Sequence, residues 1–123
     1  MVKQSINIIG IQTLYNILKE VKNNLSFELI NFATKNDFLK SIDKRNSINQ
    51  NSLILTKIIN KNFFFNNSKI KKNLFLFFSN GPDVKNNSEL NIIKYPIEIY
   101  LLIEKINIQL IKQKYNYHSK ILV

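Results

Sequence analysis

Two patterns of apolar and polar positions alternate along the chain: short apolar runs, and segments in which apolar residues recur at helical spacing. Short, almost continuous apolar runs predict buried strands at residues 5–11, 26–32, 52–56, 74–78 and 90–93. Apolar residues at three- and four-residue steps predict amphipathic helices at residues 13–24, 34–45 and 97–115. Buried strands that alternate with helices are typical of a parallel sheet covered on both faces. We therefore predict one α/β domain with a doubly wound, mostly parallel, five-stranded sheet.

Two of the predicted crossovers between strands contain little helix. Residues 60–72 hold three consecutive phenylalanines among asparagines and lysines, and their apolar positions show no helical period. Residues 79–82 are Ser-Asn-Gly-Pro, a strong turn signal, and the residues that follow are polar. We therefore predict that the third and fourth crossover helices are reduced.

The last predicted helix carries two apolar stripes, whereas a surface helix of a monomer needs only one. Pro96 stands just before this helix, where its fixed φ suits a first turn. The stripe suited to the core consists of Ile99, Leu102, Ile103, Ile106 and Leu110. The second stripe consists of Ile97, Tyr100, Leu101, Ile108 and Ile111. An apolar face without a partner predicts an interface, unless the loop at residues 80–89 folds back and buries it.

The composition raises nucleic-acid binding as an alternative. The net charge is +10, and Lys69, Lys71 and Lys72 form the densest basic run, close to the three phenylalanines. Lysines can follow a phosphate backbone, and aromatic rings can stack on bases. However, Arg45 is the single arginine among 18 basic residues, and asparagine, isoleucine and phenylalanine are abundant too. This bias indicates an A/T-rich genome, so genomic composition and a binding surface both remain explanations of the charge.

The residue types that carry most catalysis and metal binding are scarce or scattered. There is no cysteine, and His118 is the single histidine, without a triad spaced around it. Two glycines, Gly10 and Gly81, cannot build a glycine-rich phosphate loop. We therefore predict a protein that is not an enzyme and holds no metal or cofactor. No apolar run approaches the roughly 20 residues of a membrane span, and no secretory signal is visible, so we expect a cytoplasmic protein without membrane contact.

Residues 5–115 resemble the receiver domain of bacterial response regulators. The likeness rests on the order of strands and helices and on Lys94, Tyr95 and Pro96 between the last strand and the last helix. Receivers have a flavodoxin-like fold, with an acidic pair after the first strand and a phosphoacceptor aspartate ending the third. A Ser or Thr ends their fourth strand, and a Lys followed by Pro ends the fifth. The resemblance implies the same fold, although other small doubly wound proteins share this element order.

The positions that receivers use for phosphorylation are degenerate in this chain. The residues at these positions are Gly10, Ile11, Gln12, Thr56, Ser79, Lys94 and Tyr95. None of them is acidic: Gln12 lies where magnesium would be bound, and Thr56 replaces the phosphoacceptor aspartate. Tyr95 directly precedes the proline and displaces Lys94 by one residue. Because phosphoryl transfer needs a carboxylate nucleophile and carboxylate ligands for Mg²⁺, the resemblance implies a receiver that does not use phosphorylation.

The chain divides into a receiver-like domain, residues 1–115, and residues 116–123. Residues 119–123 have rising β-propensity, as at the start of a truncated winged-helix DNA-binding domain or in a tail strand that docks on the sheet. We predict a regulatory module of a transcriptional regulator, which associates through its last helix as a homodimer or with a linked DNA-binding domain. The alternative is a stand-alone basic protein that binds nucleic acid.

Overall fold

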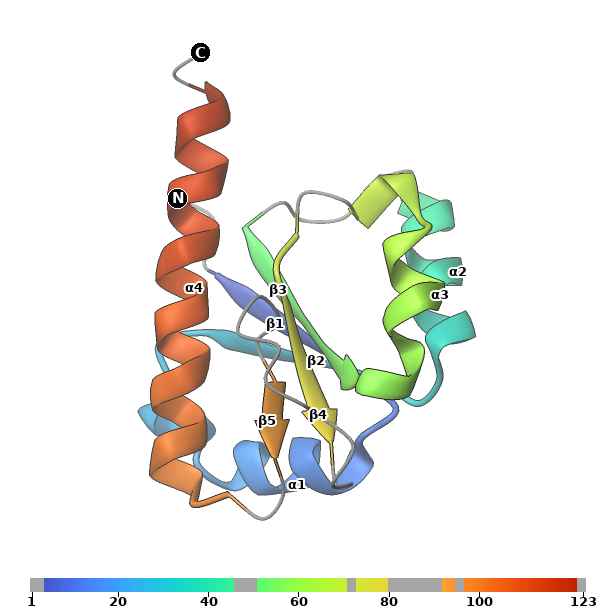
Figure 1. Ribbon diagram of the computed structural model, residues 1–123. Helices are drawn as coiled ribbons and strands as arrows, with labels where there is room; N and C mark the ends of the chain where they lie inside the picture. Colours follow the sequence, from blue (N-terminus) through green and yellow to red (C-terminus); the bar gives the residue numbers. More distant parts are fainter. Residues whose placement is uncertain (1–3, 46–50, 71–72, 80–91, 95–96, 122–123) are drawn as a thin grey trace.

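Five parallel strands form a single sheet in the computed structural model, which describes residues 4–45, 51–70, 73–79, 92–94 and 97–121 (Figure 1). The strands are β1 (Ser5–Ile9), β2 (Glu28–Phe32), β3 (Ser52–Lys57), β4 (Phe75–Ser79) and β5 (Ile92–Lys94). Their order across the sheet is β2-β1-β3-β4-β5, and every neighbouring pair is parallel. This is the order of flavodoxin-like doubly wound folds, so the predicted fold class is confirmed.

Helices cover both faces of the sheet. The described helices are α1 (Gln12–Glu20), α2 (Lys35–Arg45), α3 (Lys61–Phe65) and α4 (Ile99–Ile121). α1 and α4 lie on one face, and α2 and α3 lie on the other (Figure 1). Short 3-10 turns follow α1 and flank α3, at Lys22–Asn24, Ile58–Asn60 and Ser68–Ile70. The third crossover is therefore reduced, as predicted, whereas the fourth, residues 80–91, lies outside the described residues.

The strands bury side chains on both faces, which explains their almost continuous apolar sequences. Alternate residues of the central strands enter different cores. The core beneath α1 and α4 is aliphatic apart from Phe27 and Phe78. The core beneath α2 and α3 is built around the aromatic residues Phe38, Phe64, Phe75 and Phe77. Two separate cores therefore hold the sheet and the ends of its strands in place.

The start of α2 forms as its sequence predicts. The backbone N–H of Asp37 donates a hydrogen bond to Oγ1 of Thr34 at 3.1 Å, which satisfies a helix N–H that has no partner within the helix. Asp37 also places a negative charge in the first turn, where the helix dipole favours it.

Several elements end at other residues than predicted: α1, for example, ends at Glu20 rather than at residue 24. Two of these differences have a clear physical cause. The first strand ends at Ile9 rather than at residue 11, because Gly10 adopts a positive φ of 70° and turns the chain. α4 continues to Ile121 rather than ending at residue 115, because no glycine or proline interrupts residues 97–121. Residues 119–121 are therefore helical and do not form the predicted strand. The division of the chain at residue 116 stays a prediction.

None of the helices in the described part of the chain combines the length and the apolar character that a membrane span requires.

Candidate functional site

Four of the residues that the sequence comparison with receivers singled out lie at the carboxyl edge of the sheet. The ends of β1, β3, β4 and β5 bring together Gly10, Thr56, Ser79 and Lys94. Ser79 is in register with Lys94 on the neighbouring strand, whereas Ile11 is buried in the core beneath α1 and α4. Ligands of doubly wound folds bind at this edge, beside the point where the strand order reverses. Tyr95 lies outside the described residues.

Local hydrogen bonds engage the polar groups at this edge. Thr56 is fully buried, and its Oγ1 accepts a hydrogen bond from Nδ2 of Asn60 at 3.0 Å. Oε1 of Gln12 accepts from Nδ2 of Asn31 at 2.9 Å, and Nε2 of Gln12 donates to Oδ1 of Asn16 at 3.0 Å. Within the described residues, no group of three or more His, Cys, Asp or Glu side chains could hold a metal ion. Gln12 and Thr56 therefore supply neutral hydrogen-bonding groups in place of carboxylates, and Lys94 is the charged residue among the described positions.

The predicted basic run is only partly described. Lys71 and Lys72 lie outside the described residues. Lys69 forms an ion pair with Asp43 of α2, with 2.7 Å between Nζ and Oδ1. Because Asp43 neutralises part of its charge, Lys69 offers less to a phosphate backbone than its sequence predicts.

The three phenylalanines near this run do not form open stacking surfaces. Phe64 is buried in the aromatic core. Nζ of Lys35 lies 4.4 Å from the ring centroid of Phe63, and Nζ of Lys61 lies 5.8 Å from that of Phe65. These cation–π contacts occupy a face of each half-exposed ring, so a stacking base would have to displace a lysine.

The second apolar stripe of α4 is exposed over most of its length. Its exposed members are Tyr100, Leu101, Ile108 and Ile111. Ile97 precedes the first helical residue and packs against the core instead. Tyr115 is 74% exposed and extends the stripe by one turn beyond Ile111, where the predicted stripe ended. Its spacing from Ile108 and Ile111 continues the period and is the signal that would have identified it. The loop predicted as an alternative cover, residues 80–89, lies outside the described residues.

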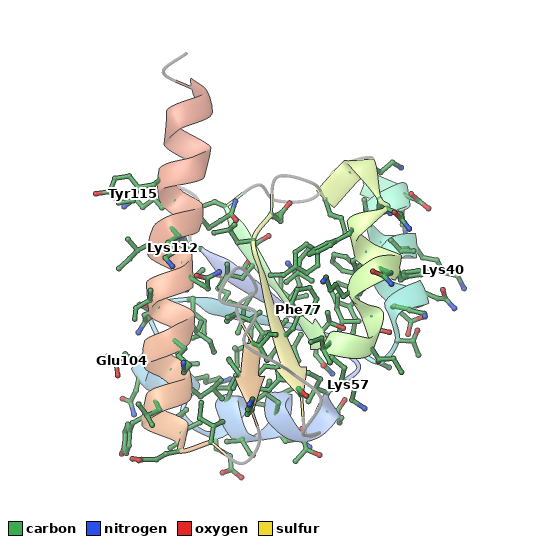
Figure 2. All side chains as sticks on the ribbon, in the orientation of Figure 1. Lys40, Lys57, Phe77, Glu104, Lys112 and Tyr115 are labelled. Atoms are coloured by element: carbon green, nitrogen blue, oxygen red, sulfur yellow. The ribbon has the colours of Figure 1, made fainter. Side chains whose placement is uncertain are left out.

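The exposed side of α4 carries a seam with coiled-coil spacing, which we call the outer seam. It consists of Leu101, Glu104, Ile108, Ile111 and Tyr115, at alternating steps of three and four residues. This is the a/d spacing of a coiled coil, which keeps the residues on one face of a helix. Leu102, Ile106 and Leu110 are buried on the opposite face. The outer seam therefore points away from the sheet, and Figure 2 shows Glu104 and Tyr115 on that side.

A hollow of about 250 Å³ adjoins the outer seam and extends it towards β5. Its lining residues are Leu76, Ile92, Ile93, Lys105, Ile108, Gln109 and Lys112. Most of this lining is aliphatic, and the two lysines are exposed. Because Ile108 belongs to both the hollow and the outer seam, the apolar surface continues from α4 to the edge strand.

Polar contacts with remote residues determine how α4 lies on the sheet. The side chain of Gln113 is buried, and its Oε1 accepts a hydrogen bond from the backbone N–H of Leu74 at 2.6 Å. Nε2 of Gln4 donates to the backbone oxygen of Leu110 at 2.7 Å. Buried hydrogen bonds favour one geometry because other arrangements leave polar groups unsatisfied. The rotation of α4, and with it the direction of the outer seam, is therefore well specified.

No protein-family model, curated protein or solved structure matched the chain, so its fold is assigned from the strand order and its function has to be argued from these surfaces.

Proposed function

We propose that this protein is a non-catalytic, receiver-like regulatory module that works without phosphorylation. It acts by association with a protein partner, either a second copy or a linked DNA-binding domain. The outer seam of α4 is the observation that carries this proposal. The neutral, locally hydrogen-bonded side chains of Gln12 and Thr56, where receivers have carboxylates, support its non-catalytic part.

The energetics of the outer seam favour association. Four of its five side chains are apolar and exposed, namely Leu101, Ile108, Ile111 and Tyr115. Removing apolar surface from water contributes about 25 cal/mol per Å², so burying these side chains stabilises a complex by several kcal/mol. The entropy lost on association offsets part of that gain. Association is therefore reversible, as regulation requires.

We expect the double variant Leu101→Lys, Ile108→Lys to lose self-association. Both substitutions place a charge within the proposed interface, and burying an unpaired lysine costs more than the interface gains. Sedimentation velocity over a range of protein concentrations measures the effect. The parent protein should form a dimer, and the variant should remain a monomer at the same concentrations.

A charge-matched control separates loss of the interface from added repulsion. Asn36→Lys with Asn62→Lys adds the same two charges at exposed positions of α2 and α3, on the other face of the sheet. This control should dimerise like the parent protein. A Leu101→Lys, Ile108→Lys variant that dimerises as the parent does would contradict the role of the outer seam. A parent that stays monomeric would leave a linked DNA-binding domain as the proposed partner.

The nucleic-acid alternative makes a different prediction for the basic run. On our proposal, replacing Lys69, Lys71 and Lys72 by Gln changes the affinity for a mixed-sequence DNA duplex at physiological salt by no more than about twofold, since no phosphate contact is lost. Fluorescence anisotropy in a salt series provides the measurement. A much larger loss, together with a steep salt dependence in the parent protein, would favour the alternative.

A further inference from the structure

We infer that the occupant of the outer seam is a second copy of this chain, packed antiparallel across a two-fold axis beside Ile108. This inference rests on the proposed function and deepens it, because it names the partner and its orientation. Three observations carry it: the pattern of charges along the seam, the position of the seam opposite the core, and the way α4 extends past the sheet.

The charge of Glu104 in the seam and that of Lys112 beside the seam match an inverted copy of themselves. Glu104 lies four residues before Ile108, and Lys112 lies four residues after it. In an antiparallel pair centred on Ile108, each Glu104 is level with the partner's Lys112. Leu101 and Tyr115, seven residues before and after Ile108, become level in the same way. The two apolar ends of the seam therefore also cover each other.

A parallel pair would bring like charges together. Glu104 would face the partner's Glu104 in the middle of an apolar seam. Like charges in contact act against an arrangement more strongly than exposed opposite charges favour one. In the described part of the chain, neither Glu104 nor Lys112 forms an ion pair, so both are available to a partner.

The position of the seam leaves room for the partner. Because the outer seam lies opposite the buried face of α4, two paired helices would have their sheets on opposite sides of the pair. Figure 1 shows that the C-terminal end of α4 extends past the sheet, so a partner helix can follow α4 there without meeting another described element. From Leu101 to Tyr115 the contact would run about 21 Å, at a rise of 1.5 Å per residue.

Engineered cysteines test the orientation directly, since the chain has no cysteine of its own. Ile108→Cys should form a covalent dimer on mild oxidation, because the two copies of position 108 meet at the axis. Leu101→Cys alone should not, because its two copies would lie about 21 Å apart along the helices, far beyond the reach of a disulfide. Leu101→Cys mixed with Tyr115→Cys should give the mixed dimer. Asn62→Cys on α3 is the exposed control and should remain uncrosslinked.

Charge reversal tests the pairing of Glu104 with Lys112. Glu104→Lys should raise the dimer dissociation constant roughly tenfold, since both symmetry-related pairs become repulsive. The double variant Glu104→Lys, Lys112→Glu should restore the parent value. Glu104→Lys with Lys105→Glu has the same net charge, and it should not restore the parent value because position 105 is not level with position 104.

The outcomes separate this inference from the proposed function. A covalent dimer of Leu101→Cys alone would overturn the antiparallel orientation and leave association through α4 intact. Restoration by Lys105→Glu instead of Lys112→Glu would overturn the register in the same way. A parent protein that sediments as a monomer would overturn the inference that a second copy occupies the seam, and the proposed function would then require a linked DNA-binding domain as the partner.

Discussion

Replacing Phe64 by Ala should lower the free energy of unfolding by about 3 to 5 kcal/mol, the range for removing a buried aromatic side chain. Phe64 is 1% exposed and is the one buried residue of α3. Its ring meets Phe38 of α2 and Phe75 of β4, with centroid distances of 5.8 and 5.9 Å. The substitution would leave a cavity between three elements. It would also loosen α3, because a helix of this length is not stable without packing.

The neighbouring phenylalanine provides a matched control. Phe63 is 37% exposed, and its contacts are an edge-on ring contact with Phe64 and the cation–π contact with Lys35. Phe63→Ala should therefore cost about 1 kcal/mol. Urea unfolding followed by circular dichroism compares the two variants, at one fixed protein concentration because the proposed dimerisation would add to stability. Equal losses would contradict the placement of Phe64 as the packing residue of α3.

Replacing Gln113 by Leu should lower the free energy of unfolding by about 1 to 3 kcal/mol, although Leu is the more apolar residue. Gln113 is 1% exposed, and its Oε1 accepts a hydrogen bond from the backbone N–H of Leu74, which lies just before β4. Leu has a similar volume but no acceptor. The substitution would therefore leave the N–H of Leu74 without this partner at the junction of α4 and the sheet. The same urea unfolding experiment measures the loss.

Two control variants provide a comparison for the stability loss of Gln113→Leu. Lys114→Leu adds the same side chain at the next, exposed position and should change stability by less than about 0.5 kcal/mol. Gln109→Leu removes a longer contact, 3.5 Å from Nε2 to the backbone oxygen of Phe75, and should cost less than Gln113→Leu. If Gln113→Leu were as stable as the parent protein, the hydrogen bond to Leu74 would not hold α4 in place.

Phe64 and Gln113 hold α3 and α4 in place, respectively, and the substitution of Gln113 bears on function through α4. If Gln113 anchors α4, its loss should also weaken dimerisation, because the outer seam would no longer have one fixed direction. The Phe64→Ala variant should dimerise normally under conditions where it is folded, because α3 lies on the other face of the sheet from α4. Stability and association can thus be separated in this chain.

The sequence was sufficient to predict the fold. A strand buried on both faces is almost continuously apolar, and an amphipathic helix repeats its apolar residues every three or four positions. Both patterns can therefore be recognised in a short stretch of sequence. The core stripe of α4, including Leu102, Ile106 and Leu110, was predicted for the same reason, and these three residues are buried. The exposed stripe with Leu101 and Ile108 was also visible, because a second apolar face stands out in the helical period.

Only the tertiary structure shows which of several similar residues are buried and which remote groups they bind. Three consecutive phenylalanines look alike in sequence, and only the packing of α3 against Phe38 and Phe75 buries Phe64 rather than its neighbours. Glutamine is usually found at the surface, yet Gln113 is buried, and its side chain accepts a hydrogen bond from the backbone of Leu74. Because Leu74 is far away in the sequence, the local pattern could not predict this contact. Helical periodicity specifies which residues share a face, whereas burial and hydrogen bonding depend on the remote residues that the fold brings to that face.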